Sequence, residues 1–133
     1  LVFNSKGDIF LQRRGLSTPI FPGFWENSAS GHVDEGETIK EAAFRELEEE
    51  TGMVPSSLEK VNEGYYEEVS GDLTLKCYET IYFAKYDGET KIDGEEVLEG
   101  KWVPLEKIYE KISLEMMAPG LIRSIELAKK YKQ

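Results

Sequence analysis

Apolar and polar positions along the chain follow patterns that predict several strands and three helices. Period-two alternation predicts two long strands at 58–70 and 73–85, joined by a turn at Gly71 and Asp72. An apolar stripe at helical spacing predicts a long helix at 114–131. We expect shorter strands at 1–3, 9–13, 29–33 and 95–103, and a short helix at 104–111. A chain of 133 residues is expected to form one domain, 1–133, and because it starts inside a predicted strand we expect further residues upstream.

A further helix, expected between Thr38 and Gly52, carries clear start and stop signals. Thr38 and Glu41 have the spacing of a capping box, in which each side chain accepts the other residue's backbone N–H. Gly52 stands where helices commonly end in a left-handed residue. The segment between them holds five glutamates but only two basic residues, Lys40 and Arg45. Because like charges three or four residues apart repel on a bare helix, we expect a divalent metal to offset the cluster.

A helical wheel separates these glutamates into groups. Glu46, Glu49 and Glu50 fall within or beside the apolar arc, which predicts three inward carboxylates, whereas Glu48 lies roughly opposite. The arc itself consists of Ile39, Ala42, Ala43 and Leu47. One interpretation is an acidic surface helix whose end protrudes from the core. For a glutamate-rich helix taken at random, this surface interpretation is the preferred one. The other interpretation is a metal site, since Mg²⁺ prefers hard carboxylate oxygens.

The chain carries a net charge of −10, from 26 acidic and 16 basic residues. This balance argues against a nucleic-acid polymer or an anionic membrane as partner, since both require basic surfaces. It leaves room for a small phosphorylated ligand, because a bound cation can reverse the local sign of charge. The one cysteine, Cys77, lies in an apolar run, is expected to be buried and fits a cytoplasmic setting. No apolar stretch approaches the ~20 residues of a membrane-spanning helix.

Candidate ligand-binding residues lie on both sides of the acidic helix. Arg13 and Arg14 offer planar forks of donors that could clamp phosphate, although a solvated strand end is the simpler interpretation from composition. The long irregular stretch 15–30 includes Trp25, which could stack on a ring of the substrate or cap the core. Glu79 stands on the otherwise apolar face of its predicted strand, which predicts an inward carboxylate.

The spacing of residues 31–53 matches a known motif. The pattern G-x5-E-x7-R-E-U-x-E-E-x-G-U, with U apolar, is met at every defined position. The matching residues are Gly31, Glu37, Arg45, Glu46, Leu47, Glu49, Glu50, Gly52 and Met53. The chain therefore resembles the Nudix hydrolase family, which implies an α+β fold with a mixed β-sheet sandwiched between α-helices. The order of the predicted elements extends the resemblance over the whole chain.

The resemblance implies hydrolysis of a nucleoside diphosphate linked to another moiety, by cleavage of a phosphoanhydride with Mg²⁺ or Mn²⁺. It implies that Glu46, Glu49 and Glu50 bind metal or activate water, and that the backbone carbonyl of Gly31 is a further metal ligand. It makes Arg45 an organiser of the loop and helix, which we count among the catalytic residues. A small phosphorylated substrate is then the expected partner, and a homodimer is left open.

The identity of the catalytic base is not fixed by the motif. We favour Glu46 as the base, with Glu49 as a second catalytic carboxylate, but the resemblance also allows a base from a later loop. Glu79, Glu95 and Glu96 are the candidates outside the motif, and we include Glu96 among the metal ligands.

The first 37 residues also resemble the isopentenyl-diphosphate isomerase branch of the family. The shared features are F-N-x-K-G at 3–7, the arginine pair at 13–14, P-G-x-W at 22–25 and N-S-x-x-G-H at 27–32. Two departures argue against isomerase chemistry, because Ser30 stands where isomerases have a catalytic cysteine and the acidic part of the motif is intact. His32, the one histidine, is either a residual metal ligand or a loop residue. We expect a hydrolase on an isomerase-like frame, with an isomerase or a non-catalytic ligand-binding module as alternatives.

Overall fold

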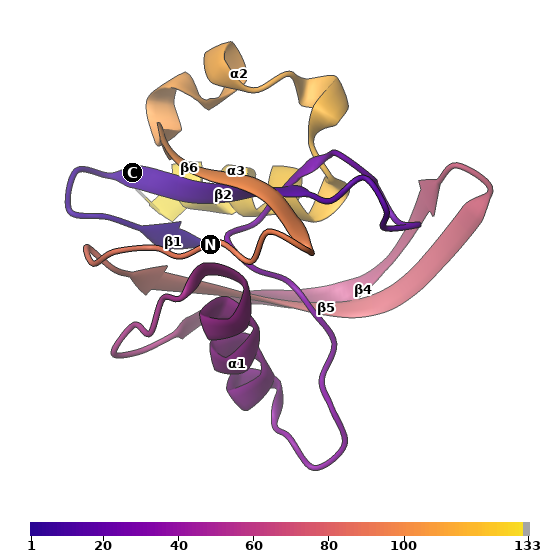
Figure 1. The fold of residues 1–133 in the computed structure, drawn as a ribbon, viewed down its shortest axis with the longest axis horizontal. Helices are drawn as coiled ribbons and strands as arrows, with labels where there is room; N and C mark the ends of the chain where they lie inside the picture. The colour runs from indigo at the N-terminus through magenta and orange to yellow at the C-terminus, as the bar shows by residue number, and fades with distance from the viewer. Residues whose placement is uncertain (132–133) are drawn as a thin grey trace.

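The computed structural model describes residues 1–131 as one six-stranded β-sheet between helices on its two faces (Figure 1). The strands are β1 (Val2–Phe3), β2 (Asp8–Arg14), β3 (Trp25–Glu26), β4 (Glu59–Ser70), β5 (Leu73–Lys85) and β6 (Val97–Pro104). The helices are α1 (Ile39–Thr51), α2 (Ile108–Lys111) and α3 (Pro119–Tyr131), with 3-10 turns at Leu105–Lys107 and Leu114–Met116. The strand order is β3-β2-β1-β5-β4, with β6 also against β2, and β1 pairs with β5 in parallel while the other pairs are antiparallel. The expected α+β fold with a mixed sheet is confirmed.

Alternate residues of β2 face two separate cores. Ile9 and Leu11 belong to a buried cluster that includes Leu121 of α3 and Ile108 of α2. Phe10 belongs to a second cluster, which includes Leu47 of α1. A strand buried on both faces is apolar at consecutive positions rather than at alternate ones, which explains this run in the sequence. The two clusters hold α1 on one face of the sheet and α2 and α3 on the other.

α1 begins and ends where its sequence signals predict. The Thr38 side chain accepts a hydrogen bond from the Glu41 N–H at 3.1 Å, and the Thr38 N–H donates to Glu41 Oε1 at 3.0 Å. Gly52 takes a φ of 73°, and its N–H donates to the Glu48 carbonyl at 2.9 Å. Left-handed backbone is least costly for glycine, so this residue ends the helix. The capping box in turn fixes where the preceding loop meets the helix.

β4 and β5 form a long antiparallel hairpin that curves away from the body of the sheet (Figure 1). The two predicted strands are confirmed, and Gly64 lies opposite Glu79 in their register. Full burial on β5 begins only at Ile81, close to where β5 pairs with β1. Cys77, which we expected to be buried, is exposed, because it lies on the part of the hairpin that projects past the two cores.

The predicted strand at 29–33 is wrong. The short strand of this region is β3, in which Trp25 pairs with Arg13 and Glu26 pairs with Gln12. The chain then leaves the sheet, and Gly31 packs against a side chain of α1 instead of entering a strand ladder.

The last helix starts later than predicted, at Pro119 rather than at 114. Proline suits the first turn of a helix, where its missing N–H has no partner to lose, and it disfavours a helix that continues through it. Neither α3 nor another helix within residues 1–131 is long and apolar enough to span a bilayer.

Candidate functional site

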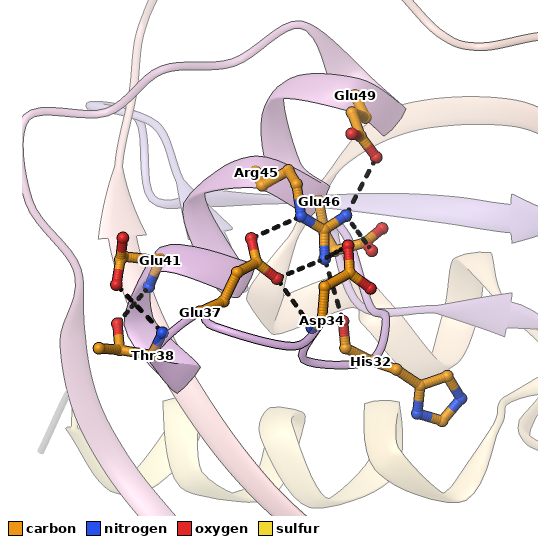
Figure 2. Close-up of polar contacts among 8 residues, drawn as sticks. All are labelled: His32, Asp34, Glu37, Thr38, Glu41, Arg45, Glu46 and Glu49. Atoms are coloured by element: carbon orange, nitrogen blue, oxygen red, sulfur yellow. Dashed lines mark hydrogen bonds and ion pairs between the residues drawn. The ribbon is translucent and has the colours of Figure 1, made fainter.

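Arg45 ties the loop before α1 to the helix itself (Figure 2). Its Nε and Nη2 donate to the two carboxylate oxygens of Glu37 at 2.7 and 2.9 Å, and its Nη1 donates to Glu46 Oε1 at 2.7 Å. Further contacts join Arg45 to the His32 carbonyl at 3.0 Å, Glu49 at 3.3 Å and Asp34 at 3.4 Å. The hydrogen bond from Arg45 lowers the pKa of Glu37, and Glu37 followed by Glu46 raises the pKa of Arg45. These charge-assisted bonds hold the loop against the helix.

Gly31 and His32 approach this network in different ways. A Cβ atom built on Gly31 would overlap the carboxyl group of Glu46, so glycine is the residue that leaves room for this contact. His32 contributes its backbone carbonyl to Arg45, while its ring points away from the network (Figure 2). The position of His32 therefore fits the loop interpretation better than the interpretation as a residual metal ligand.

Glu50 places a buried carboxyl group at the inner face of α1. The residue is 5 % exposed, and its Oε1 accepts a hydrogen bond from Gln12 Nε2 at 2.8 Å. Its Oε2 is buried and has no hydrogen-bond partner among the residues that the structure describes. Burial raises the pKa of Glu50 to about 8, although the hydrogen bond from Gln12 opposes this, and the adjacent Glu46 adds to the rise. The sequence analysis did not predict Gln12 as a site residue. The feature that could have indicated it is a polar amide side chain directly after three consecutive apolar residues of β2.

The three glutamates of the motif differ in exposure. The Glu46 side chain is 17 % exposed, so Glu46 and Glu50 face inward as the wheel predicts. The Glu49 side chain is 59 % exposed, so its predicted inward orientation is wrong. Glu49 lies at the edge of the arc, where Arg45 one turn earlier holds it at the helix surface. Within residues 1–131, no three His, Cys, Asp or Glu side chains converge as a metal-ligand group. Of the predicted metal-binding carboxylates, Glu46 and Glu50 lie next to each other inside the fold.

A cleft of about 910 Å³ lies beside the inner face of α1. The carboxyl-bearing residues that line it include Glu26, Asp34, Glu46, Glu50, Glu68, Glu79, Glu95 and Glu96. Glu96, one of the predicted metal ligands, is exposed, and its backbone carbonyl accepts the Gly15 N–H at 3.0 Å. So many carboxyl groups make the cleft acidic, and an anionic phosphate would need a cation there.

Arg13 and Arg14 order the loop that follows β2. Arg13 Nε donates to the Gly23 carbonyl at 2.9 Å. Arg14 Nε donates to the Ile20 carbonyl at 2.8 Å, and its Nη2 donates to Thr18 Oγ1 at 3.2 Å. Successive strand residues point to opposite faces, and of this pair Arg14 lines the cleft. Arg14 is therefore the member of the pair placed to meet a ligand.

Trp25 lies in the core rather than in the cleft. It is 8 % exposed and belongs to the cluster between the sheet and α3. Lys101 Nζ lies 4.9 Å from the centroid of its ring. This placement fits our alternative interpretation, in which the aromatic residue caps the core.

Comparisons with known proteins find a matching family model and similar sequences. A family model described as a NUDIX domain matches residues 1–127. The chain is 31 % identical to an uncharacterised Nudix hydrolase of Pseudomonas aeruginosa, over 96 % of this chain and 73 % of that protein. It is 34 % identical to isopentenyl-diphosphate Delta-isomerase 2 of Photorhabdus laumondii, over 84 % of this chain. The chain spans only 63 % of that isomerase's length.

Solved structures share the fold. A MutT protein from Methanosarcina mazei superimposes with a TM-score of 0.78 at 24 % identity, covering 100 % of this chain and 91 % of the other. The NUDIX domain of Shewanella oneidensis NrtR, solved as a complex with ADP ribose, gives a TM-score of 0.76 at 23 % identity, covering 99 % and 84 %.

Proposed function

The chain belongs to the Nudix family, and from that premise we propose that it is a Mg²⁺-dependent hydrolase of a nucleoside diphosphate linked to another moiety. The bond cleaved is a phosphoanhydride. The observation that carries this proposal is the pair of inward carboxyl groups on α1, in which a buried Glu50 oxygen that has no hydrogen-bond partner within residues 1–131 lies beside Glu46. A buried carboxyl oxygen without a hydrogen bond is costly unless a ligand or ion binds it.

The donor set fits a hard divalent cation. Glu46 and Glu50 offer carboxylate oxygens, and the contact of Gly31 with Glu46 places the backbone beside them. Mg²⁺ takes a few such oxygens and keeps waters and substrate phosphates as its other ligands. We propose that Glu49 and Glu96, both exposed, complete the set from the solvent side. When bound, the ion would neutralise phosphate charge and make a bound water more acidic.

We assign the remaining steps of the reaction to individual residues of this chain. We assign Glu46 as the base that takes a proton from the attacking water as the new P–O bond forms and the bridging P–O bond breaks. Arg45 anchors Glu46 Oε1, which leaves Oε2 to accept that proton. Glu49 is assigned as the second catalytic carboxylate, held on the same arginine. Arg14 lines the cleft and would contact the substrate's phosphates.

A substrate panel tests this function. The purified protein is incubated with Mg²⁺ and nucleoside triphosphates, sugar nucleotides, dinucleoside polyphosphates and isoprenoid diphosphates, and released phosphate products are quantified. Glu50→Gln should lose most activity on the best substrate, while Glu48→Gln, an exposed neighbour on the same helix, should retain it. Full activity of Glu50→Gln would overturn the site assignment. Tight nucleotide binding without any product would support a non-catalytic module instead.

The isomerase is a second candidate, favoured by the 34 % identity to the Photorhabdus enzyme. It predicts rearrangement of isopentenyl diphosphate with no phosphate released. Ser30 lies at the position of the isomerase cysteine, and a hydroxyl is a much weaker acid than a thiol. The same panel separates the two candidates, since hydrolysis and isomerisation give different products.

A further inference from the structure

The cleft has a second group of polar residues at the end of β3, outside the motif. Glu26 is 9 % exposed, and its Oε1 accepts hydrogen bonds from the backbone N–H and Nδ2 of Asn27 at 2.9 and 3.2 Å. Asn27 Oδ1 is buried and has no hydrogen-bond partner in the described part of the chain. Both residues line the cleft. An amide oxygen in this state needs a donor from water or from a ligand.

Glu79 of β5 lies close to this pair and is held rigidly. Its two carboxylate oxygens accept from Arg123 Nε and Nη2, each at 2.8 Å. Arg123 also donates to Glu68, and its guanidinium carbon lies 3.9 Å from the centroid of the Tyr66 ring. Such a bidentate pair fixes the direction of a carboxylate better than a single bond does. Glu79 therefore presents its remaining lone pairs in one orientation.

Gly120, in the first turn of α3, shows how closely these groups converge. A Cβ built on Gly120 would lie 3.1 Å from Glu79 Oε2, 3.6 Å from Glu26 Oε1 and 3.7 Å from Asn27 Nδ2. Three polar side chains, from β3, from the residue that follows β3 and from β5, thus surround one point. Gly120 itself lines the cleft, so a side chain there would crowd the space that these groups face.

A row of polar side chains connects the group of Glu26, Asn27 and Glu79 to the carboxyl groups of α1. Gln12, which donates to Glu50, is the cross-strand partner of Glu26 in the β2–β3 register. Residues paired in this way lie on the same face of the sheet. Because buried polar groups cost free energy when a core could be apolar, this row is better explained by a ligand than by folding.

We propose that Glu26, Asn27 and Glu79 form a specificity pocket that accepts the N–H or O–H donors of the substrate's non-phosphate moiety, with Arg123 as the positioning residue for Glu79. This inference rests on the proposed function, because it assigns the phosphates to the α1 end of the same cleft. The ligand group is one rich in donors, such as an amino-bearing nucleobase or a ribose. A hydrocarbon chain would displace water from these acceptors without replacing its hydrogen bonds.

Binding of four diphosphates that differ only in their non-phosphate part tests the pocket. ADP, IDP, dADP and isopentenyl diphosphate are titrated into the protein in Mg²⁺ by calorimetry. ADP should bind about 10- to 100-fold more tightly than isopentenyl diphosphate, the range expected for hydrogen bonds to charged groups. A loss of affinity in IDP assigns the donor to the nucleobase amine, and a loss in dADP assigns it to the ribose 2′-hydroxyl. Equal affinity for all four ligands would overturn the proposal.

Substitutions in the pocket distinguish a role in ligand recognition from a role in folding. Glu79→Gln and Arg123→Ala should reduce the ratio of ADP to isopentenyl diphosphate affinity toward one, while the dissociation constant of isopentenyl diphosphate stays unchanged. Arg123→Lys should restore only part of the ratio, since lysine cannot form the bidentate pair. Glu67→Gln, an exposed residue of β4, is the matched control and should change neither value. A parallel loss of affinity for both ligands would show a merely structural role and refute the assignment.

The binding test of the pocket does not depend on whether the protein hydrolyses a substrate. If no substrate is hydrolysed but the ratio collapses in the variants, the pocket stands and the proposed hydrolase fails. If hydrolysis occurs but the ratio is one in the unchanged protein, the hydrolase stands and the pocket fails.

Discussion

Glu50→Gln should stabilise the metal-free protein at neutral and alkaline pH. Glu50 is 5 % exposed and lies next to Glu46, and one of its carboxyl oxygens has no hydrogen-bond partner in the part of the chain that the structure describes. Ionising it inside the fold is therefore costly, and burial raises its pKa from an ordinary value of 4.5 to about 8. Glutamine keeps an oxygen that can accept the Gln12 hydrogen bond but never carries the charge.

The raised pKa of Glu50 determines the sign and the size of the change in the free energy of unfolding. Below pH 4.5 the carboxyl group is protonated in both the folded and unfolded states, and it costs nothing. As the pH rises toward 8, the unfolded chain releases the proton and the folded chain retains it, so the free energy of unfolding falls. The loss is about 3 kcal/mol at pH 7 and approaches about 5 kcal/mol above pH 8. Glu50→Gln removes this loss, so its advantage should grow over the same window.

Urea unfolding in EDTA from pH 4 to pH 9 measures this difference. The free energy of unfolding of Glu50→Gln minus that of the unchanged protein should rise with pH and then level off. Glu48→Gln, exposed on the same helix, should show a flat difference. Added Mg²⁺ should stabilise the unchanged protein at pH 8 more than it stabilises Glu50→Gln, because the ion binds the ionised carboxylate. A difference that stays flat between pH 5 and pH 8 would refute the reasoning.

Three further substitutions test the parts around this carboxyl group. Arg45→Lys should lower Mg²⁺ affinity or activity by about 10- to 100-fold, because lysine cannot bridge Glu37 and Glu46 together; unchanged metal titrations and kinetics would contradict this. Gly31→Ala should displace the Glu46 carboxyl group, weakening Mg²⁺ binding in calorimetry and costing about 1–3 kcal/mol in urea unfolding, and wild-type values for both would exclude the close contact. Thr38→Ala should cost about 1 kcal/mol of stability through loss of the capping box, with little effect on the Mg²⁺ dissociation constant; thermal denaturation at fixed pH measures it.

The acidic helix was the part of the molecule that the sequence predicted best. Its start and end rest on local chemistry, the capping box of Thr38 and the left-handed Gly52, which need no distant partner. The inward direction of Glu46 and Glu50 follows from helical periodicity alone. Glu49 departs from the wheel because a neighbouring arginine competes for it at the surface, and a wheel contains no such partner.

Features set by distant contacts were harder to predict. Cys77 lies in an apolar run, yet the hairpin carries it past both cores, which the local pattern does not show. Gln12 becomes a site residue only because the sheet brings it to Glu50, 38 positions away in the sequence. Trp25 could have served a ligand or the core, and packing against the sheet decides its place. The pairing of Arg123 with Glu79 likewise joins residues 44 positions apart in the sequence.

We propose that water attacks a phosphoanhydride in the cleft beside α1. The direct measurement is turnover of each member of the substrate panel in ¹⁸O-labelled water with Mg²⁺, followed by mass spectrometry of the products. One ¹⁸O atom should appear in a phosphate group of a product, with the signal absent in EDTA and strongly reduced in Glu50→Gln. Rearranged isopentenyl diphosphate with no label in phosphate, or no labelled phosphate from any substrate in the panel, would contradict it.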